Sequence, residues 1–251
     1  MAKAAALKAL ELDESLAVAH EALGCVHWLY DWDLRAAESE ILRALELNPG
    51  DAIAHLWYGT FVCLIKEDLE RARAEAKQAQ ELDPLALLVN STLGWGYVVV
   101  DQYGRAIEQA RKTLEIYPDS LHAYSVLGLA SLAKGILGDA VAALEKAVAI
   151  SRDSFSLAIL GHAYARSGQA GKAEALLSEL LERSEREYVL PTAFATLYTG
   201  LGQKDSAFCW LGKAYEERLG MLFWLKAAPV YHPLRDDPRF QDLVRRIGLP
   251  P

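Results

Sequence analysis

Apolar residues along most of this chain recur at intervals of three and four, a spacing that places them on one face of a helix. The stretch Ile107-Glu-Gln-Ala110-Arg-Lys-Thr-Leu114-Glu-Ile116 is a clear example. Turn signals rich in Gly, Pro, Asp and Asn, such as Asn48-Pro-Gly-Asp51 and Lys134-Gly135, separate these segments. The pattern therefore predicts an all-α chain built from successive helices.

This helical pattern repeats with a period near 34 residues, and two columns of small residues mark the period. The first column consists of Ala37, Ala72, Ala106, Ala140, Ala173 and Ala207, and the second, twelve or thirteen residues earlier, of Gly24, Gly59, Gly94, Gly128, Gly161 and Ala195. Two helices can cross closely only where the side chains between them are small. Each period therefore predicts one pair of helices, and the six pairs begin near residues 17, 52, 87, 121, 154 and 188.

Two of the repeats carry a recognisable motif. Leu93-Gly94-x2-Tyr97…Ala106…Pro118 and Leu160-Gly161-x2-Tyr164…Ala173 resemble the tetratricopeptide repeat. The resemblance implies a right-handed α–α superhelix, a solenoid in which residues 15–220 form six helix pairs within one continuous domain.

Residues 1–14 resemble the second helix of a further repeat, because Ala9-Leu-Glu-Leu aligns with Ala44-Leu-Glu-Leu. We interpret them as a leading half-repeat whose first helix was removed when the segment was cut from a longer protein. An apolar face that includes Leu7 and Leu10 would then lack its partner. It would either pack back on the first pair or join a second copy in a weak homodimer.

Residues 221–251 predict a C-terminal cap. Asp237 and Pro238 are typical of the start of a helix, and an apolar stripe formed by Phe240, Leu243, Val244 and Ile247 suits the last open face of a solenoid. The run from Leu225 to Phe240, together with Tyr30-Asp-Trp-Asp33, is similar to the C-terminal repeat regions of multidomain bacterial transcriptional regulators and signalling proteins. That resemblance implies a sensor or interaction module of a larger bacterial regulator.

The amino-acid composition limits the classes of partner that we expect the chain to bind. The chain has 26 Lys and Arg against 34 Asp and Glu, and its net charge of −8 argues against direct nucleic-acid binding. Three isolated cysteines, Cys25, Cys63 and Cys209, indicate a reducing compartment, and we expect the protein to be cytoplasmic. No apolar run reaches the roughly 18 residues that a membrane span needs, so we expect no membrane association.

Catalytic and metal-binding patterns are hard to find in the sequence. His20 and His27, the nearest pair of histidines, lie seven residues apart on a predicted helix, about 10 Å by its rise and too far to share one zinc ion. Gly168-Gln-Ala-Gly171-Lys172 lacks the spacing and the preceding strand of a phosphate loop. We expect no enzyme, no cofactor and no metal, and predict a non-enzymatic protein–protein interaction scaffold.

The resemblance also implies a concave groove lined by the first helices of the repeats. The groove positions that it indicates are Trp28, Leu29, Leu56, Thr60, Ser91, Trp95, Val98, Val99, His122, Leu129, His162 and Arg166. Because the N-terminal half of this set is apolar and aromatic, we expect an apolar peptide or helix as the ligand. Three alternatives remain: these side chains only pack in the interior, the groove near Trp28 and Trp95 is the pocket of a small-molecule sensor, or the chain is an oligomeric assembly subunit.

Overall fold

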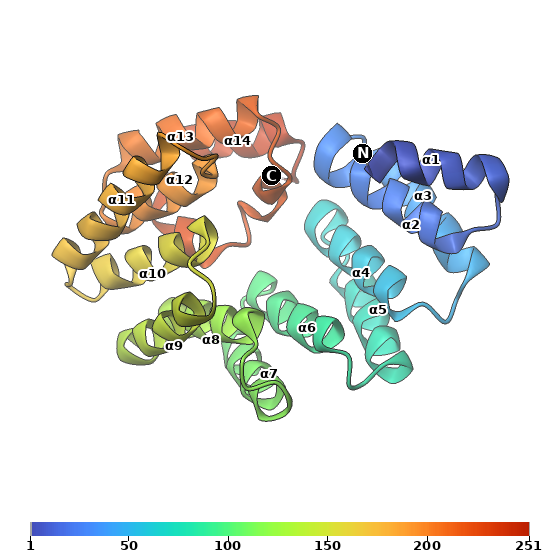
Figure 1. The fold of residues 1–251 in the computed structure, drawn as a ribbon, viewed down its shortest axis with the longest axis horizontal. Coiled ribbons are helices and arrows are strands. Elements are labelled where there is room, and N and C mark those ends of the chain that lie inside the picture. Colours follow the sequence, from blue (N-terminus) through green and yellow to red (C-terminus); the bar gives the residue numbers. More distant parts are fainter. Residues whose placement is uncertain (1, 251) are drawn as a thin grey trace. The chain divides into compact units, whose positions relative to one another are not determined.

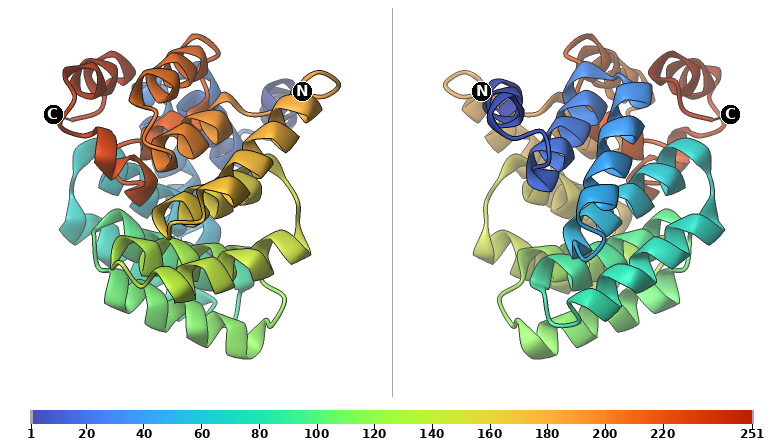
Figure 2. Two further views of the ribbon diagram at one scale, coloured as in Figure 1. Left: turned by 90° about the vertical axis from the view of Figure 1, so that its left-hand side faces the viewer. Right: turned by 90° about the vertical axis from the view of Figure 1, so that its right-hand side faces the viewer.

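The computed structural model describes residues 2–250, and within them all regular structure is helical and no strand occurs (Figures 1 and 2). The prediction of an all-α fold is confirmed. The α-helices are α1 (Ala2–Leu12), α2 (Ala17–Val26), α3 (Leu34–Leu47), α4 (Ala52–Lys66), α5 (Leu69–Leu82), α6 (Leu87–Val99), α7 (Tyr103–Ile116), α8 (Leu121–Ala133), α9 (Leu137–Ile150), α10 (Ser154–Arg166), α11 (Ala170–Ser184), α12 (Pro191–Gly200), α13 (Lys204–Glu216) and α14 (Pro238–Ile247). Three short helices complete the chain: the π-helix η1 (His27–Asp31) and the 3₁₀-helices η2 (Gly220–Trp224) and η3 (Pro229–Leu234).

The chain divides into two compact units. Unit 1 comprises the residues up to Thr92 together with Arg218–Phe223, and unit 2 comprises Leu93–Glu217 together with Trp224–Leu249. Helix α6 begins in unit 1 and ends in unit 2, and the segment that follows α13 is likewise divided between the units.

Consecutive helices pack in pairs inside each unit, α2 with α3 and α4 with α5 in unit 1, and α8 with α9, α10 with α11 and α12 with α13 in unit 2 (Figure 1). The small residues lie at close helix contacts, and Gly24 and Gly128 face the second helix of their own pair. Gly94 and Gly161 instead come closest to the first helix of the following pair, at Val126 and Leu197. A Cβ atom built on Gly128 would lie 2.4 Å from Cγ of Leu144, which shows that only glycine fits there. The column alanines Ala37, Ala106 and Ala140 are fully buried. Close helix crossing therefore depends on these small side chains.

A residue with left-handed backbone conformation stands between the first and second helix of every pair. These residues are Trp32 (φ 58°), Glu67 (53°), Asp101 (57°), Gly135 (75°), Gly168 (80°) and Gly202 (74°). In the first two pairs the preceding turn is wider, because the amides of Trp32 and Glu67 donate to the carbonyls of His27 and Val62, five residues earlier. This extra residue makes the two small columns thirteen residues apart there and twelve elsewhere.

Side-chain caps fix where many of the helices begin. The carboxylate of Asp51 accepts from the amides of Ile53 and Ala54 at the start of α4, and Ser120 and Asp153 cap α8 and α10 in the same way. Such caps satisfy amides that have no partner inside the helix. The first helix of the sixth pair begins at Pro191, a residue well suited to the first turn.

The N-terminal helix α1 packs against α2, and Lys3 of α1 pairs with Asp31 of η1. Ala6 is buried, whereas Leu7 and Leu12 are 46% and 79% exposed. Of the two expectations for this helix, packing on the first pair is therefore what the structure shows, and part of its apolar surface remains open.

The region predicted as a cap has two parts with different surroundings. Helix α14 packs against α13 and buries its whole predicted stripe, Phe240, Leu243, Val244 and Ile247. Asp237 caps this helix and Gly248 ends it with a φ of 86°. Residues 220–234 have other neighbours: η2 lies largely in unit 1, and η3 packs against α8 and α12 in unit 2.

Candidate functional site

The first-helix side chains predicted to line a groove are partly in the protein interior. Trp28, the aromatic anchor expected in unit 1, is fully buried and is therefore a core residue. Its ring contacts those of Trp57 (centroids 6.3 Å apart, 88° between planes), Phe61 (5.3 Å, 81°) and Phe223 (6.1 Å, 50°). Phe223 also lies 5.2 Å from the ring of Trp32. Edge-to-face packing of this kind stabilises the interior of unit 1 and leaves Trp28 unable to touch a ligand.

Four other predicted groove residues belong to unit 1. Leu56 and Ser91 are 6% and 5% exposed, so both are buried. Thr60 is half-buried and its hydroxyl donates to the carbonyl of Leu56 at 2.8 Å. Leu29 is half-buried beneath η2, where a Cβ atom on Gly220 would lie 2.6 Å from its carbonyl oxygen. Glycine at position 220 thus lets residues 218–223 lie directly on this helix.

Three predicted groove residues of unit 2 are also buried. Val98 belongs to an apolar cluster with Ala106, Ala110, Val126 and Ala130. Leu129 of α8 and His162 of α10 are 3% and 1% exposed. As the chain is folded, the side chains of Val98, Leu129 and His162 therefore do not reach the surface.

His162 has a defined chemical state. Its Nδ1 atom lies 3.1 Å from the carbonyl oxygen of Thr196 on α12, which makes Nδ1 the protonated donor. Burial lowers the pKa of His162 to about 4, and the nearby Arg166 contributes to this direction. The ring is therefore neutral at physiological pH, and its buried Nε2 atom has no hydrogen-bond partner among the described residues.

The remaining predicted residues keep contact with solvent. His122 and Arg166 are exposed, and Trp95 and Val99 are half-buried. The Trp95 ring packs against the Val98 cluster on one side and lies 6.3 Å from the ring of Phe155, a half-buried residue at the start of α10. Trp95 of α6 and Phe155 of α10 thus lie beside one another with partial access to solvent, while His122 and Arg166 are exposed on α8 and α10.

Residues 229–234 cover another part of the first helices in unit 2. Figures 1 and 2 show this segment between α13 and α14 lying beside α12. Tyr231 is buried there: its hydroxyl donates to the carbonyl of Thr192 at 3.3 Å and lies 3.1 Å from Oγ1 of Thr196. Neither Phe223 nor Tyr231 was among the predicted site residues. Their only sequence signal is the apolar, proline-rich character of residues 221–234, which was assigned to the cap.

Histidines at equivalent positions of the first two repeats are used for structure. The Nε2 atoms of His20 and His55 lie 3.1 Å and 3.0 Å from the carbonyl oxygens of Glu14 and Pro49, and each Nδ1 pairs with a glutamate of the second helix. Asn90, at the same position of the third repeat, donates to the carbonyl of Pro84. These side chains hold the turn before each pair. Within residues 2–250 no three His, Cys, Asp or Glu side chains are grouped to hold a metal ion.

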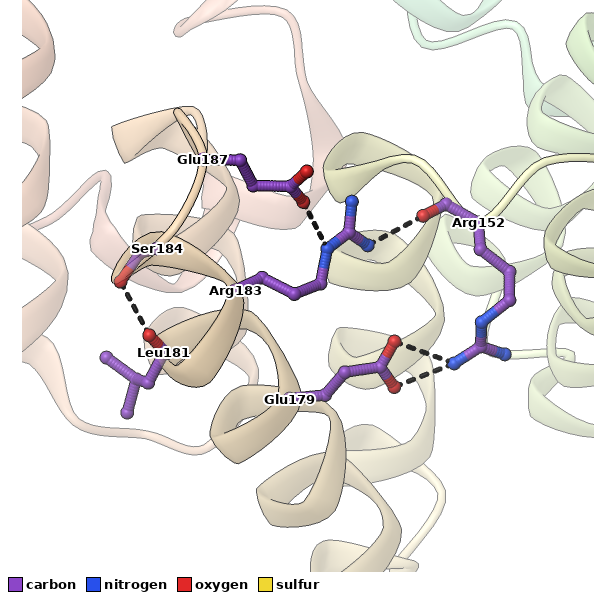
Figure 3. A network of polar contacts seen from close by, with 6 residues as sticks. All are labelled: Arg152, Glu179, Leu181, Arg183, Ser184 and Glu187. Carbon is purple, nitrogen blue, oxygen red and sulfur yellow. Dashed lines mark hydrogen bonds and ion pairs between the residues drawn. The ribbon is translucent and has the colours of Figure 1, made fainter.

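A network of charged side chains joins α11 to the turn before α10 (Figure 3). Arg152 donates to both carboxylate oxygens of Glu179, and its carbonyl accepts from Arg183 at 2.8 Å. Arg183 also pairs with Glu187. Because these groups are largely exposed and balance one another in charge, the network orders a turn and does not mark a site.

Cys25 and Cys63 have no activated character. Burial raises the pKa of Cys25 to about 12 and also raises the pKa of Cys63, so both are protonated thiols at neutral pH. Among the described residues, no helix is long and apolar enough to cross a membrane.

Comparison with known proteins supports the repeat assignment. Residues 31–86 and 92–155 match the family described as "Tetratricopeptide repeat", and these two stretches therefore carry tetratricopeptide repeats. Among curated protein sequences, none matches this chain.

Several solved structures share the fold. The chain is similar to PilW, a type IV pilus biogenesis factor, with 18% identity and a TM-score of 0.60 over 91% of this chain and 98% of that one. It is similar to PilF of Pseudomonas aeruginosa, with 18% identity and a TM-score of 0.57 over 81% and 92% of the two chains. A tetratricopeptide-repeat protein of Thermus thermophilus gives 20% identity and a TM-score of 0.63 over 74% and 98%. At these identities the likeness shows the fold, an all-α helical-repeat solenoid.

Proposed function

We propose that this chain, which carries tetratricopeptide repeats, is a non-enzymatic protein–protein interaction scaffold. The observation that carries the proposal is the accessible surface on the first helices of unit 2, where Trp95, Phe155 and His122 remain in contact with solvent. Solenoid repeats use such extended surfaces for binding, and tryptophan is enriched where binding energy is concentrated.

The chemistry of this surface favours an apolar segment of a partner protein. Trp95 and Phe155 offer two tilted rings 6.3 Å apart, and Val99 adds a half-buried aliphatic side chain nearby on α6. Arg166 is the exposed cation of α10 and gives a negatively charged group of the partner a place to pair. We therefore propose an apolar peptide or helix as the ligand.

The similarity of Leu225–Phe240 to bacterial regulators supports a finer form of the proposal. In this form the chain is the sensor or interaction module of a larger cytoplasmic regulator. Partner binding would then control a separate effector domain, and the chain itself would contact neither nucleic acid nor membrane.

A Trp95→Ala substitution tests the binding surface. We expect the affinity for a captured partner to fall by about 2 kcal/mol or more, because a central tryptophan at an interface is commonly a hot spot. Partner binding is measured by pull-down followed by calorimetry with the purified partner. Tyr30→Ala is the matched control, because Tyr30 is 76% exposed and lies in unit 1.

Circular dichroism of the Trp95→Ala variant separates binding from folding. An unchanged helix content with weakened binding supports the proposal, and Trp95→Phe should retain most of the affinity. Loss of the folded state in the alanine variant, with full binding by Trp95→Phe and by Phe155→Ala, would assign Trp95 to the core and overturn the binding surface.

We further propose a weak homodimer through α1, because the structure leaves Leu7 and Leu12 of that helix open to solvent. Sedimentation over a wide concentration range is expected to show reversible association that Leu7→Glu with Leu12→Glu abolishes. A constant monomer mass for the native chain would contradict it.

A further inference from the structure

The segment Pro229–Leu234 occupies the first-helix face of unit 2 in the manner of a bound peptide. It packs against α8 and α12, which belong to different helix pairs. Its buried residues are Pro229, Val230, Tyr231 and Leu234. Figure 1 shows the segment entering this position from the loop between α13 and α14.

Recognition of Tyr231 is specific in chemistry as well as in shape. Burial raises the pKa of Tyr231 to about 12, so its hydroxyl keeps the proton that it donates to the Thr192 carbonyl. Thr196 provides the second contact through Oγ1, and its own carbonyl is held by His162. The face therefore offers one acceptor and one hydroxyl positioned for a phenol.

The segment is a short 3₁₀-helix with few amides to donate. It begins at Pro229 and contains Pro233, and neither proline has an amide hydrogen. The guanidinium of Arg235 donates to the carbonyl of Lys226, which closes the loop on itself. A short, proline-restricted loop loses little conformational entropy on docking, a property typical of exchangeable peptide ligands.

Two hydroxyls of the receptor helices are satisfied without the segment, whereas that of Thr196 takes the Tyr231 hydroxyl as its partner. The hydroxyl of Ser125 on α8 donates to the Leu121 carbonyl at 2.9 Å, and that of Thr199 on α12 donates to the Ala195 carbonyl at 2.7 Å. Helices α8 and α12 also pack firmly on α9 and α13. Departure of the segment would leave the helix pairs and these hydrogen bonds in place.

We propose that this face is a receptor for a short apolar segment with a tyrosine between prolines, that residues 229–234 are its resident ligand, and that a partner protein binds by presenting the same chemistry in their place. The proposal deepens the scaffold function and rests on it for the existence of a partner. The exchange of the resident segment is a separate property of this chain.

A synthetic peptide tests the exchange. The probe is a fluorescent peptide of residues 227–236, Ala-Ala-Pro-Val-Tyr-His-Pro-Leu-Arg-Asp, titrated against the full chain and its Tyr231→Ala variant. We expect the variant to bind the peptide at least tenfold more tightly than the native chain, because its own segment no longer competes. A peptide with alanine for tyrosine should lose at least tenfold in affinity, and one with phenylalanine should lose less.

Two further variants locate the site. Thr196→Val in the Tyr231→Ala background should weaken peptide binding severalfold, whereas Trp95→Ala in that background should leave it unchanged. A result against the proposed binding surface at Trp95 can thus be told apart from a result against the exchange of residues 229–234. Equal peptide affinity for the native chain and a correctly folded Tyr231→Ala variant would overturn the proposal.

Hydrogen exchange on the native chain keeps the proposal testable even where the variant does not fold. The amides of Val230, Tyr231, His232, Leu234 and Arg235 are expected to exchange at least tenfold faster than those of the middle of α12. Equal protection of both would make the segment a permanent part of the core and overturn the proposal. A native chain that doubles its mass at high concentration by exchanging this segment would assign the face to a second copy, which also contradicts a partner protein as its occupant.

Discussion

Both units have part of their first-helix surface covered by the segment that follows α13, but with different chemistry. In unit 1 the covering residue is Phe223, whose side chain has no polar atom and packs among the rings of Trp28 and Trp32. In unit 2 it is Tyr231, which is held by hydrogen bonds to Thr192 and Thr196. The phenylalanine ring is held by packing alone, whereas the hydrogen bonds of the phenol can be made equally by a phenol of another chain.

The units also differ in how the first helix turns into the second. Trp32 and Glu67 hold the left-handed position in unit 1, whereas unit 2 has Asp101 there in its first pair and Gly135, Gly168 and Gly202 in the other three. A residue with a side chain is strained at such a position and glycine is not. Repeats with the same fold thus form the same turn with different amounts of backbone strain.

The largest effect is expected from removing the aromatic cover of unit 1. Phe223→Ala should lower the free energy of unfolding by about 3 kcal/mol or more, because it leaves a cavity beside Trp28. Urea unfolding followed by tryptophan fluorescence measures the change. Met221→Ala in the same 3₁₀-helix is the matched control, because Met221 is 39% exposed. Equal stabilities of the two variants would show that η2 is not part of the core.

A pH effect is expected from His162 in unit 2. Its pKa is about 4 in the folded protein against an ordinary value of 6.5, so between these values the unfolded chain binds the proton and the folded chain does not. Stability is therefore unaffected above pH 6.5 and falls as the pH drops toward 4, by a total on the order of 3 kcal/mol. Comparison with His162→Gln isolates this slope. Parallel stability curves for the two proteins would contradict the buried neutral histidine.

The smallest effects concern the turns, and they should have opposite signs in the two units. Gly168→Ala is expected to lower the free energy of unfolding by about 1 kcal/mol, and Glu67→Gly to raise it by about 0.5 kcal/mol. Thermal unfolding by circular dichroism measures both. Gly171→Ala serves as the control, because that glycine lies within α11 with open space around its Cβ position. A stabilising Gly168→Ala would show that the left-handed turn carries no strain.

Much of the local structure follows from the sequence, because its causes are local. The column alanines Ala37, Ala106 and Ala140 are fully buried where the period placed them, and Asp237 caps the helix that its sequence signals. Helix periodicity, small contact residues and caps act over a few residues or one repeat. The one-residue difference between repeats has an equally local cause, the wide last turn before Trp32 and Glu67.

The candidate site depended on contacts that no local pattern reveals. His122 and Arg166 are exposed, but Trp28, Leu129 and His162 occupy equally plausible first-helix positions and are buried. Which first-helix residues stay open depends partly on where a distant segment lies. By itself, the sequence determined an all-α chain of paired helices, because the residues that set the helix period and the caps lie within each repeat. Only the tertiary structure decided that Phe223 and Tyr231 pack onto the first helices. Where these rings are buried depends on which surfaces the folded repeats offer, and those surfaces form only once residues far apart in the sequence have come together.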